Sequence, residues 1–355
     1  MKVKEFLQRK NIEFSARRYG VDAMSAMAQG LFCSLLIGTI IKTLGQQLHV
    51  SLLVDIGQYA FAMSGPAMAI AIGYALKADP MVLFSLTGVG WAANAEGGAG
   101  GPLAVLVIAI VAAEIGKMVS KETKVDILVT PAVTVLVGVA LAKLIAPPIG
   151  AAASAFGKLI VYATELQPFW MGVAVSVLVG IALTLPISSA AICTVLKLTG
   201  LAGGAAVAGC CAQMVGFAVM SFRENRWGGL VSQGLGTSML QMGNIVKNPR
   251  IWLPPILTSA ITGPLATCLF RLEMNGEPVS SGMGTCGLVG QIGIWTGWMS
   301  PSADALANGA AAIVPGGMDW LGLVLICFIL PAVLCWLLGN AFRRIGWIKE
   351  NDLKL

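Results

Sequence analysis

Two amide side chains stand out in a chain that is otherwise almost entirely apolar. The stretch GLGTSMLQMGNIVKNPR, residues 234–250, places Gln241 and Asn244 directly after a glycine-punctuated hydrophobic turn. A side-chain amide offers N–H donors and a carbonyl acceptor without carrying a charge. We therefore expect Gln241 and Asn244 to bind a small polar solute, and we expect their replacement by leucine to weaken that binding.

A second uncharged constellation lies in GMGTCGLVGQ, residues 282–291, which contains Thr285 and Gln291. The surrounding glycines leave the backbone accessible, because they carry no side chain. A neutral, hydroxyl-rich ligand such as a sugar suits these groups. The alternative is that the glycines only permit close packing of helices.

Carboxylate chemistry is suggested by the sequence NAEGGAGG, residues 94–101, in which Asn94 and Glu96 precede a run of glycines. An ionised carboxylate inside a bilayer costs about 2.5 to 3.5 kcal/mol even on the lenient insertion scale. Glu96 should therefore face a polar cavity or a partner. The alternative is an ordinary loop in which Glu96 is hydrated.

Asp55 and Gln58 form a further candidate pair early in an apolar run. They are about one helical turn apart, so a helix would place both on the same face. We include Asp55 among the candidate solute-binding residues. The alternative is a hydrated entry to the membrane segment.

Other chemistries are disfavoured by what the sequence lacks. It contains no GxxxxGK[ST] phosphate-binding sequence, which argues against an ATP-hydrolysing pump. The cysteines form no metal-type CxxC pair, and the one histidine, His49, lies between two apolar runs. We expect no metal, no cofactor and no catalytic residue.

The composition is that of a membrane protein. Of 355 residues, 57% are hydrophobic and 11% are charged, against about 25% charged in soluble domains. The net charge of +6 comes partly from basic clusters before the first apolar run and after the last one. The positive-inside rule explains these clusters without nucleic acid and predicts that both termini are cytoplasmic.

Apolar runs long enough to cross a bilayer recur along the chain, and we expect about ten membrane segments in an all-α integral membrane protein. The predicted organisation is a basic arm at 1–21, a membrane domain at 22–340 and a cytoplasmic tail at 341–355. Two neighbouring segments are expected at about 127–147 and 151–164. Glu114 and Lys117, three residues apart, are expected to form a pair on the protein surface.

Two regions break the hydrophobic pattern with Gly, Ser and Gln, at 188–246 and after residue 282. Backbone groups facing lipid must be satisfied inside a helix, so broken segments are tolerated only against protein or a water-filled cavity. Discontinuous helices and re-entrant hairpins of this kind often mark the substrate site of a carrier.

The stretch 234–250 resembles a motif of the membrane IIC subunits of bacterial sugar phosphotransferase systems. Those subunits carry a short GITE sequence in a hairpin, and the fructose-like members continue with a D-P pair and an apolar helix. Residues 236–239 occupy the place of GITE, Asn248–Pro249 resembles the D-P pair, and IWLPPILTSAITGPLA resembles the following helix. The wider chain is similar to a IIC-like branch that includes proteins named as the perfringolysin regulator.

The resemblance implies a homodimeric, elevator-type permease of the bacterial cell membrane, not an enzyme by itself. Such carriers present a sugar to separate IIA and IIB partner proteins for phosphorylation. One departure is sharp, because Met239 stands where the family has a carboxylate that binds sugar hydroxyls. Either Gln241, Asn244, Glu96 or Asp55 takes over that role, or the ligand is not a usual sugar. A membrane-embedded sensor, or a carrier without phosphoryl transfer, is the alternative function.

Overall fold

Helices dominate the computed structural model, which describes residues 3–355. Within that range there is no strand, and one isolated antiparallel bridge joins Gly200 to Met274. The all-α membrane architecture predicted from the sequence is therefore confirmed. Six helical segments are long and apolar enough to cross a bilayer: Arg18–Leu48, Pro80–Val119, Asp126–Thr164, Gly200–Met220, Pro249–Leu269 and Gly317–Arg344. The total of about ten membrane segments stays a prediction.

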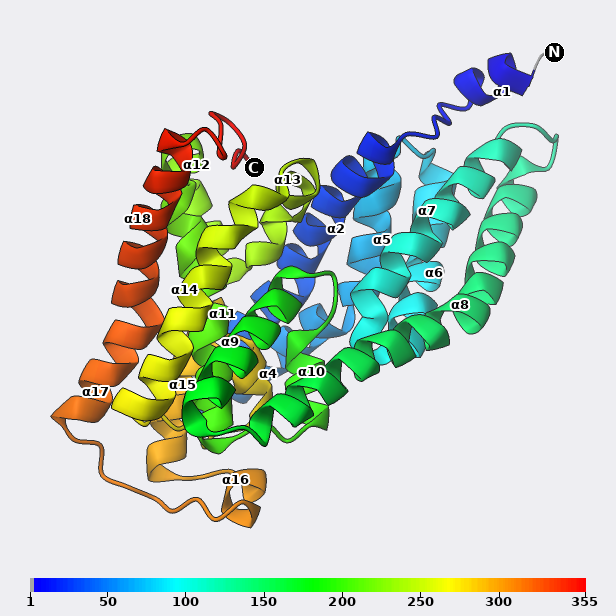
Figure 1. The fold of residues 1–355 in the computed structure, drawn as a ribbon. Helices are drawn as coiled ribbons and strands as arrows, with labels where there is room; N and C mark the ends of the chain where they lie inside the picture. The colour runs from blue at the N-terminus through cyan, green and yellow to red at the C-terminus, as the bar shows by residue number, and fades with distance from the viewer. Residues whose placement is uncertain (1–2) are drawn as a thin grey trace. The chain divides into compact units, whose positions relative to one another are not determined.

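The helices group into two compact units, Met1–Ala153 and Ser154–Leu355 (Figure 1). The first unit holds α1 Val3–Arg9, α2 Met24–Leu31, α3 Ile37–Leu48, α4 Ser51–Ala62, α5 Ser64–Ala75, α6 Pro80–Gly97, α7 Gly101–Val119 and most of α8 Asp126–Thr164. The second holds α9 Pro168–Thr184, α10 Ser189–Val195, α11 Gly200–Met220, α12 Phe222–Val231, α13 Met242–Lys247, α14 Leu253–Pro264, α15 Val289–Met299, α16 Ala303–Ala307, α17 Gly317–Val324 and α18 Leu330–Arg344.

Helices α6 and α7 form an antiparallel hairpin in the first unit. A Cβ added to Gly97 would lie 2.9 Å from Ala104, and one added to Gly116 would lie 2.8 Å from Val82. The turn between the helices needs Gly98, whose φ of +49° lies in the region that favours glycine. The break expected at residues 94–103 is confirmed.

Helix α8 corrects the expectation of two separate segments at 127–147 and 151–164. It runs without interruption for 39 residues, although Pro131, Pro147 and Pro148 lie inside it. Each proline removes one backbone donor. The neighbouring turns keep their hydrogen bonds, because an apolar surrounding offers the backbone no other partners.

Helix α11 is the central helix of the second unit and packs against α9, α14 and α18. Between Gly203 and Met220 all but two of its residues are buried, so it is enclosed on every side. The approach to α9 depends on Gly209, since a Cβ there would collide with the Ser176 carbonyl group. Close helix packing therefore explains this glycine.

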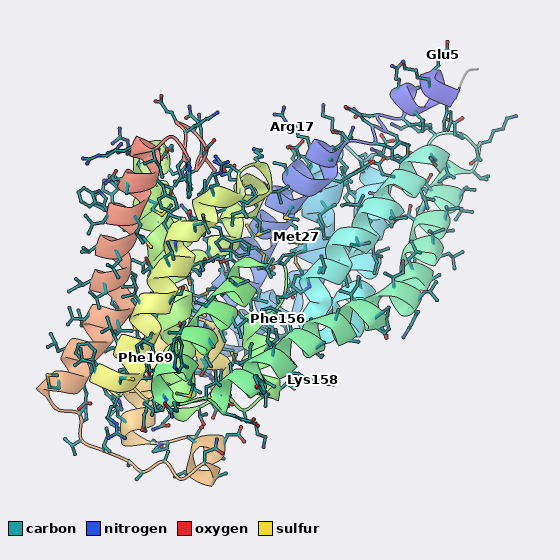
Figure 2. All side chains as sticks on the ribbon, in the orientation of Figure 1. Glu5, Arg17, Met27, Phe156, Lys158 and Phe169 are labelled. Atoms are coloured by element: carbon teal, nitrogen blue, oxygen red, sulfur yellow. The ribbon has the colours of Figure 1, made fainter. Side chains whose placement is uncertain are left out.

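The N-terminal arm carries exposed charged side chains, among them Glu5 and Arg17 (Figure 2).

The expectation that Glu114 and Lys117 form a pair on the protein surface is wrong, because their exposed fractions are 6% and 2%. The Lys117 ammonium group lies 2.8 Å from a Glu114 carboxylate oxygen. It also donates to the carbonyl groups of Asn11 and Leu76, both at 2.9 Å, so the folded arm and the end of α5 cover the pair.

Replacing Glu114 by Gln should destabilise the protein strongly, since it leaves the Lys117 charge buried without its counter-ion. The expected loss is about 3 to 5 kcal/mol of unfolding free energy. The matched control is Glu122→Gln, because the Glu122 side chain is 34% exposed where it pairs with Arg9 and Lys10, both at 2.5 Å. Chemical unfolding in detergent should show little change for that control. Equal losses in the two variants would contradict the buried-pair assignment.

Candidate functional site

The predicted motif stretch is an interrupted helix in the second unit. A π-helical turn, Ser232–Gly236, is followed by Thr237 in an extended conformation, with φ −158° and ψ 143°. The Thr237 hydroxyl accepts a hydrogen bond from the Met239 N–H at 3.1 Å and so caps the next turn, Ser238–Gln241. A side chain that captures a backbone donor in this way favours a helix start over continuation. The break therefore fixes where Ser238 lies.

Ser238 belongs to a hydroxyl cluster, which we define as Thr184, Gln213, Ser238, Trp252 and Ser259. The Ser238 and Thr184 hydroxyl oxygens are 2.8 Å apart. Gln213 is the common partner, because its carbonyl oxygen accepts from the Trp252 indole N–H at 2.9 Å and from Thr184 at 3.2 Å. Its amide group donates to Ser259 at 3.4 Å. The cluster is thus assembled from α9, α11, α14 and the short helical turns on either side of α13.

The hydroxyl cluster is enclosed as well as uncharged. Thr184, Gln213, Ser238 and Ser259 all have an exposed fraction of 0%. Each of these groups can both donate and accept, so the cluster can exchange its internal hydrogen bonds for bonds to ligand hydroxyls. In this conformation none of these four side chains is open to solvent.

Gln241 and Asn244 lie in a second, neighbouring set, the amide cluster, which we define as Asn225, Gln233, Gln241 and Asn244. The Asn244 amide donates to the Gln241 carbonyl oxygen, and the Gln241 amide donates to that of Gln233, both at 2.8 Å. Gln233 in turn donates to the Ser221 hydroxyl at 2.8 Å. The two residues predicted from sequence are therefore brought together by a continuous line of hydrogen bonds.

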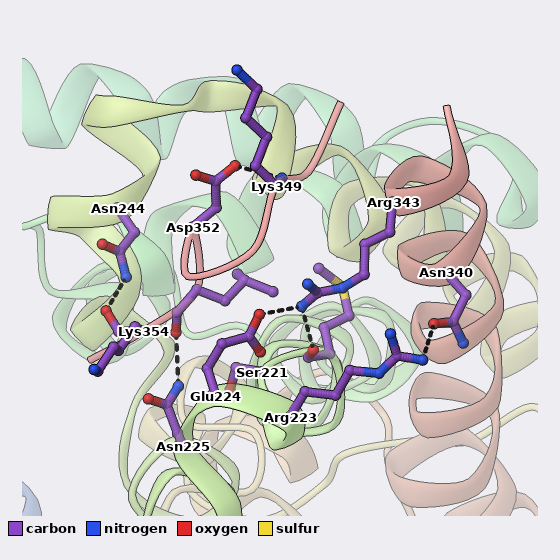
Figure 3. Close-up of polar contacts among 12 residues, drawn as sticks. Ser221, Arg223, Glu224, Asn225, Asn244, Asn340, Arg343, Lys349, Asp352 and Lys354 are labelled. Carbon is purple, nitrogen blue, oxygen red and sulfur yellow. Dashed lines mark hydrogen bonds and ion pairs between the residues drawn. The ribbon is translucent and has the colours of Figure 1, made fainter. Parts of the chain in front are cut away.

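The amide cluster also holds the chain's own C-terminal segment. Gln241 donates to the Leu353 carbonyl oxygen at 3.0 Å. Asn244 donates to that of Lys354 at 2.9 Å (Figure 3). Asn225 donates to the Leu353 carbonyl as well, at 2.7 Å. In this conformation peptide groups occupy the positions where solute hydroxyls were expected.

Thr285 and Gln291 lie on the second glycine-rich segment, which also breaks its helix. Thr285 is fully buried and donates to the Gly234 carbonyl, so it lies beside the start of the motif stretch. Gln291 donates to the Cys211 sulfur at 3.2 Å, and its own carbonyl oxygen is buried without a hydrogen-bond partner. An unpartnered buried acceptor is costly, so Gln291 retains capacity for a donor.

The remaining candidates, Asp55, Asn94 and Glu96, belong to the first unit. Asn94 lies near the end of α6 and donates to the Ser64 hydroxyl, at the start of α5, at 3.4 Å. Glu96 forms an ion pair with Lys143 of α8, and the Glu96 side chain is 32% exposed. It therefore has the partner that the sequence argument required. Asp55 and Gln58 are both exposed on α4.

Several members of these clusters were missed from the sequence. Thr184, Gln213 and Ser259 are single polar residues in apolar helices, and isolated residues of this kind usually carry no signal. Gln213 was detectable in principle, since a full amide in the middle of a 21-residue apolar helix needs a partner.

Glu224, in the sequence RENR, was also missed. The Glu224 side chain is nearly buried and forms an ion pair with Arg343 at 2.7 Å (Figure 3).

Within residues 3–355 no group of three or more His, Cys, Asp or Glu side chains could hold a metal ion. The buried polar side chains of the motif stretch, Thr237, Ser238, Gln241 and Asn244, offer hydrogen bonding by neutral groups.

Comparison with known families gives one result that spans almost the whole chain. The family model described as "Phosphotransferase system, EIIC" matches residues 21–355. Comparisons with curated proteins and with solved structures returned no match.

Gln213→Leu should lower the thermal stability of the protein, because Trp252 and Thr184 would lose a buried hydrogen-bond acceptor. Each buried group left unsatisfied costs about 1 to 3 kcal/mol. Gln47→Leu is a matched control, since Gln47 is exposed at the end of α3. Thermal unfolding in detergent, followed by tryptophan fluorescence, should show a clear decrease for Gln213→Leu alone. An unchanged midpoint would mean that Gln213 does not hold the cluster together.

Proposed function

Since the chain belongs to the phosphotransferase system EIIC family, we propose that it is a permease that carries a sugar across the bacterial plasma membrane by alternating access. The observation that carries the proposal is the enclosed hydroxyl cluster beside an interrupted helix. Sugars present many hydroxyl groups and no charge. A neutral cluster of hydroxyls and amides can match them without the desolvation cost of a buried ion.

The proposed solute-binding set combines the residues predicted from sequence with those that the hydroxyl cluster adds. Ser238, Thr184 and Gln213 provide groups that donate and accept, and Gln241 and Asn244 extend the set. Thr285 positions the motif stretch through Gly234, and Gln291 offers its unpartnered acceptor. Asn94, Glu96 and Asp55 remain proposed contributions of the first unit.

Transport requires the hydroxyl cluster to open to each side of the membrane in turn. The breaks at Thr237 and at the glycines near Thr285 interrupt rigid helical structure in two segments, which meet where Thr285 donates to the Gly234 carbonyl. Such breaks allow short helical pieces to move without unfolding whole helices. Both termini are proposed to face the cytoplasm, where the basic residues of the arm and tail would lie.

Phosphorylation of the solute would depend on separate IIA and IIB proteins, and a homodimer is the proposed assembly. Met239 is buried, with an exposed fraction of 4%, and cannot accept a hydrogen bond as a carboxylate does. A charge-assisted hydrogen bond of that kind contributes about 1.5 to 3 kcal/mol. The neutral set therefore predicts weaker sugar binding than a site with the motif's acid.

Proteoliposomes containing the purified protein should take up at least one radiolabelled sugar from a panel of glucose, fructose, galactose and mannitol. Uptake above that of empty vesicles would support the carrier. Saturable binding of a sugar without uptake would contradict it and favour the membrane-embedded sensor. Equal uptake with and without phosphorylated IIA and IIB proteins would exclude obligatory coupling to phosphoryl transfer.

Ser238→Ala should weaken binding of the transported sugar about two- to tenfold, which corresponds to the loss of one ordinary hydrogen bond. The matched control is Thr194→Val, because Thr194 is exposed on α10 and its hydroxyl donates only to its own helix. Equilibrium binding by scintillation proximity would compare the two variants. Identical affinities would remove Ser238 from the binding set.

A further inference from the structure

The segment that follows α18 folds back onto the amide cluster, and we call this segment, residues 347–355, the strap. Its distal half is held by side-chain amides that bind its main chain, as described above for Leu353 and Lys354 (Figure 3). The Leu355 backbone N–H also donates to the side-chain carbonyl oxygen of Asn225 at 2.9 Å. Asn225 therefore pairs with the strap in both directions, much as a neighbouring strand would.

The proximal half of the strap is anchored by Asn248. Its amide donates to the Trp347 carbonyl at 2.9 Å and to the Asp352 carboxylate at 2.7 Å. That carboxylate also accepts from the Lys349 N–H at 2.8 Å, which closes the strap into a compact turn. The Arg250 guanidinium group lies 5.6 Å from the centre of the Trp347 ring.

Two apolar side chains seat the strap. Ile348 is 2% exposed and Leu353 is fully buried, whereas Lys349, Glu350 and Asn351 are exposed. The surface thus holds the main chain of a turned segment through side-chain amides and buries two of its apolar side chains, which are the two kinds of contact that bind a peptide. The strap forms neither a regular helix nor a strand, and segments with few buried contacts open more readily than a helical core.

Counting hydrogens shows what the strap does to the amide cluster. The Gln241 amide has two hydrogens, and they go to Gln233 and to the Leu353 carbonyl. The Asn244 amide also has two, and they go to Gln241 and to the Lys354 carbonyl. With the strap in place, neither residue keeps an N–H for a solute.

We propose that the amide cluster is a peptide-binding surface whose ligand is the strap, and that the strap must leave before a solute can engage Gln241 and Asn244. This inference rests on the proposed function only in taking these two residues as solute ligands. The strap is then an internal competitor that keeps the site closed. Apparent solute affinity is reduced by the fraction of molecules in which the site is closed.

Access can be measured without knowing the solute. In a Cys33→Ser, Cys268→Ser background, which removes the two exposed cysteines, Asn244→Cys provides a reporter thiol under the strap. Leu353→Asp places a charge in the apolar seat and should raise the rate of N-ethylmaleimide labelling at residue 244 at least about tenfold. Leu355→Asp, at a side chain that is 49% exposed, is the matched control and should label as the parent does. Leu353→Ala should be intermediate.

Hydrogen–deuterium exchange of the strap and of residues 241–247 checks that the fold survives. Raised exchange confined to these segments, together with faster labelling, supports the strap. Raised exchange without faster labelling, or no change in either measurement, overturns it. If Leu353→Asp loses protection from exchange throughout the chain, Leu353→Ala replaces it in the comparison. The same two outcomes then support or overturn the strap.

Sugar binding then separates this inference from the proposed function. Using the same sugar panel with residue 244 restored to Asn, Leu353→Asp should bind the recognised sugar several-fold more tightly than Leu355→Asp. Faster labelling with equal sugar affinity overturns the competition between strap and solute. Faster labelling with no sugar binding in any variant supports the strap as an access barrier and counts against the sugar carrier.

Discussion

The structure of the second unit depends on one constraint: polar groups buried in an apolar protein must satisfy one another. Gln213 lies in the most enclosed helix, and its amide has no solvent to bind. Its carbonyl oxygen and amide group therefore bind Trp252, Thr184 and Ser259. These bonds hold α9, α11 and α14 together around the start of the motif stretch. The break at Thr237 follows from the same need, because it turns Ser238 towards Thr184.

This constraint also gives a physical reading of the departure from the family motif. A carboxylate at position 239 would have to be buried, since Met239 is only 4% exposed. A buried charge needs a partner or a strong set of donors. The neighbouring residues Thr237, Ser238 and Gln241 already have hydrogen-bond partners of their own. A buried methionine makes no such demand. Met239 is therefore one part of a neutral, buried neighbourhood rather than an isolated substitution.

The sequence predicted the features that rest on long patterns or on glycine. Apolar runs identified the all-α membrane class, and the glycines after Glu96 correctly located the turn between α6 and α7. The amides of Gln241 and Asn244 were recognised as unusual, but their partner was not, because the strap lies 110 or more residues further along the chain. No local pattern encodes such a distant contact.

Other features of the fold could not be predicted from the sequence, because the same residue type occurs in several structural environments. Glu114 and Lys117 have the spacing of a surface pair, yet the arm and the end of α5 bury them. Two segments were expected at about 127–147 and 151–164, although α8 continues through its prolines as one helix. Thr184 and Ser259 resemble any small polar residue in an apolar helix until the fold brings Gln213 between them.

Trp252 offers the most direct test of the central claim, that the hydroxyl cluster binds the solute. Its indole N–H binds Gln213, so a sugar that enters the cluster should change its fluorescence. Titrating the wild-type protein and Trp252→Phe with the recognised sugar should give a saturable change that is lost in the variant. A saturable change of equal size in both proteins would place the sugar elsewhere and contradict the account.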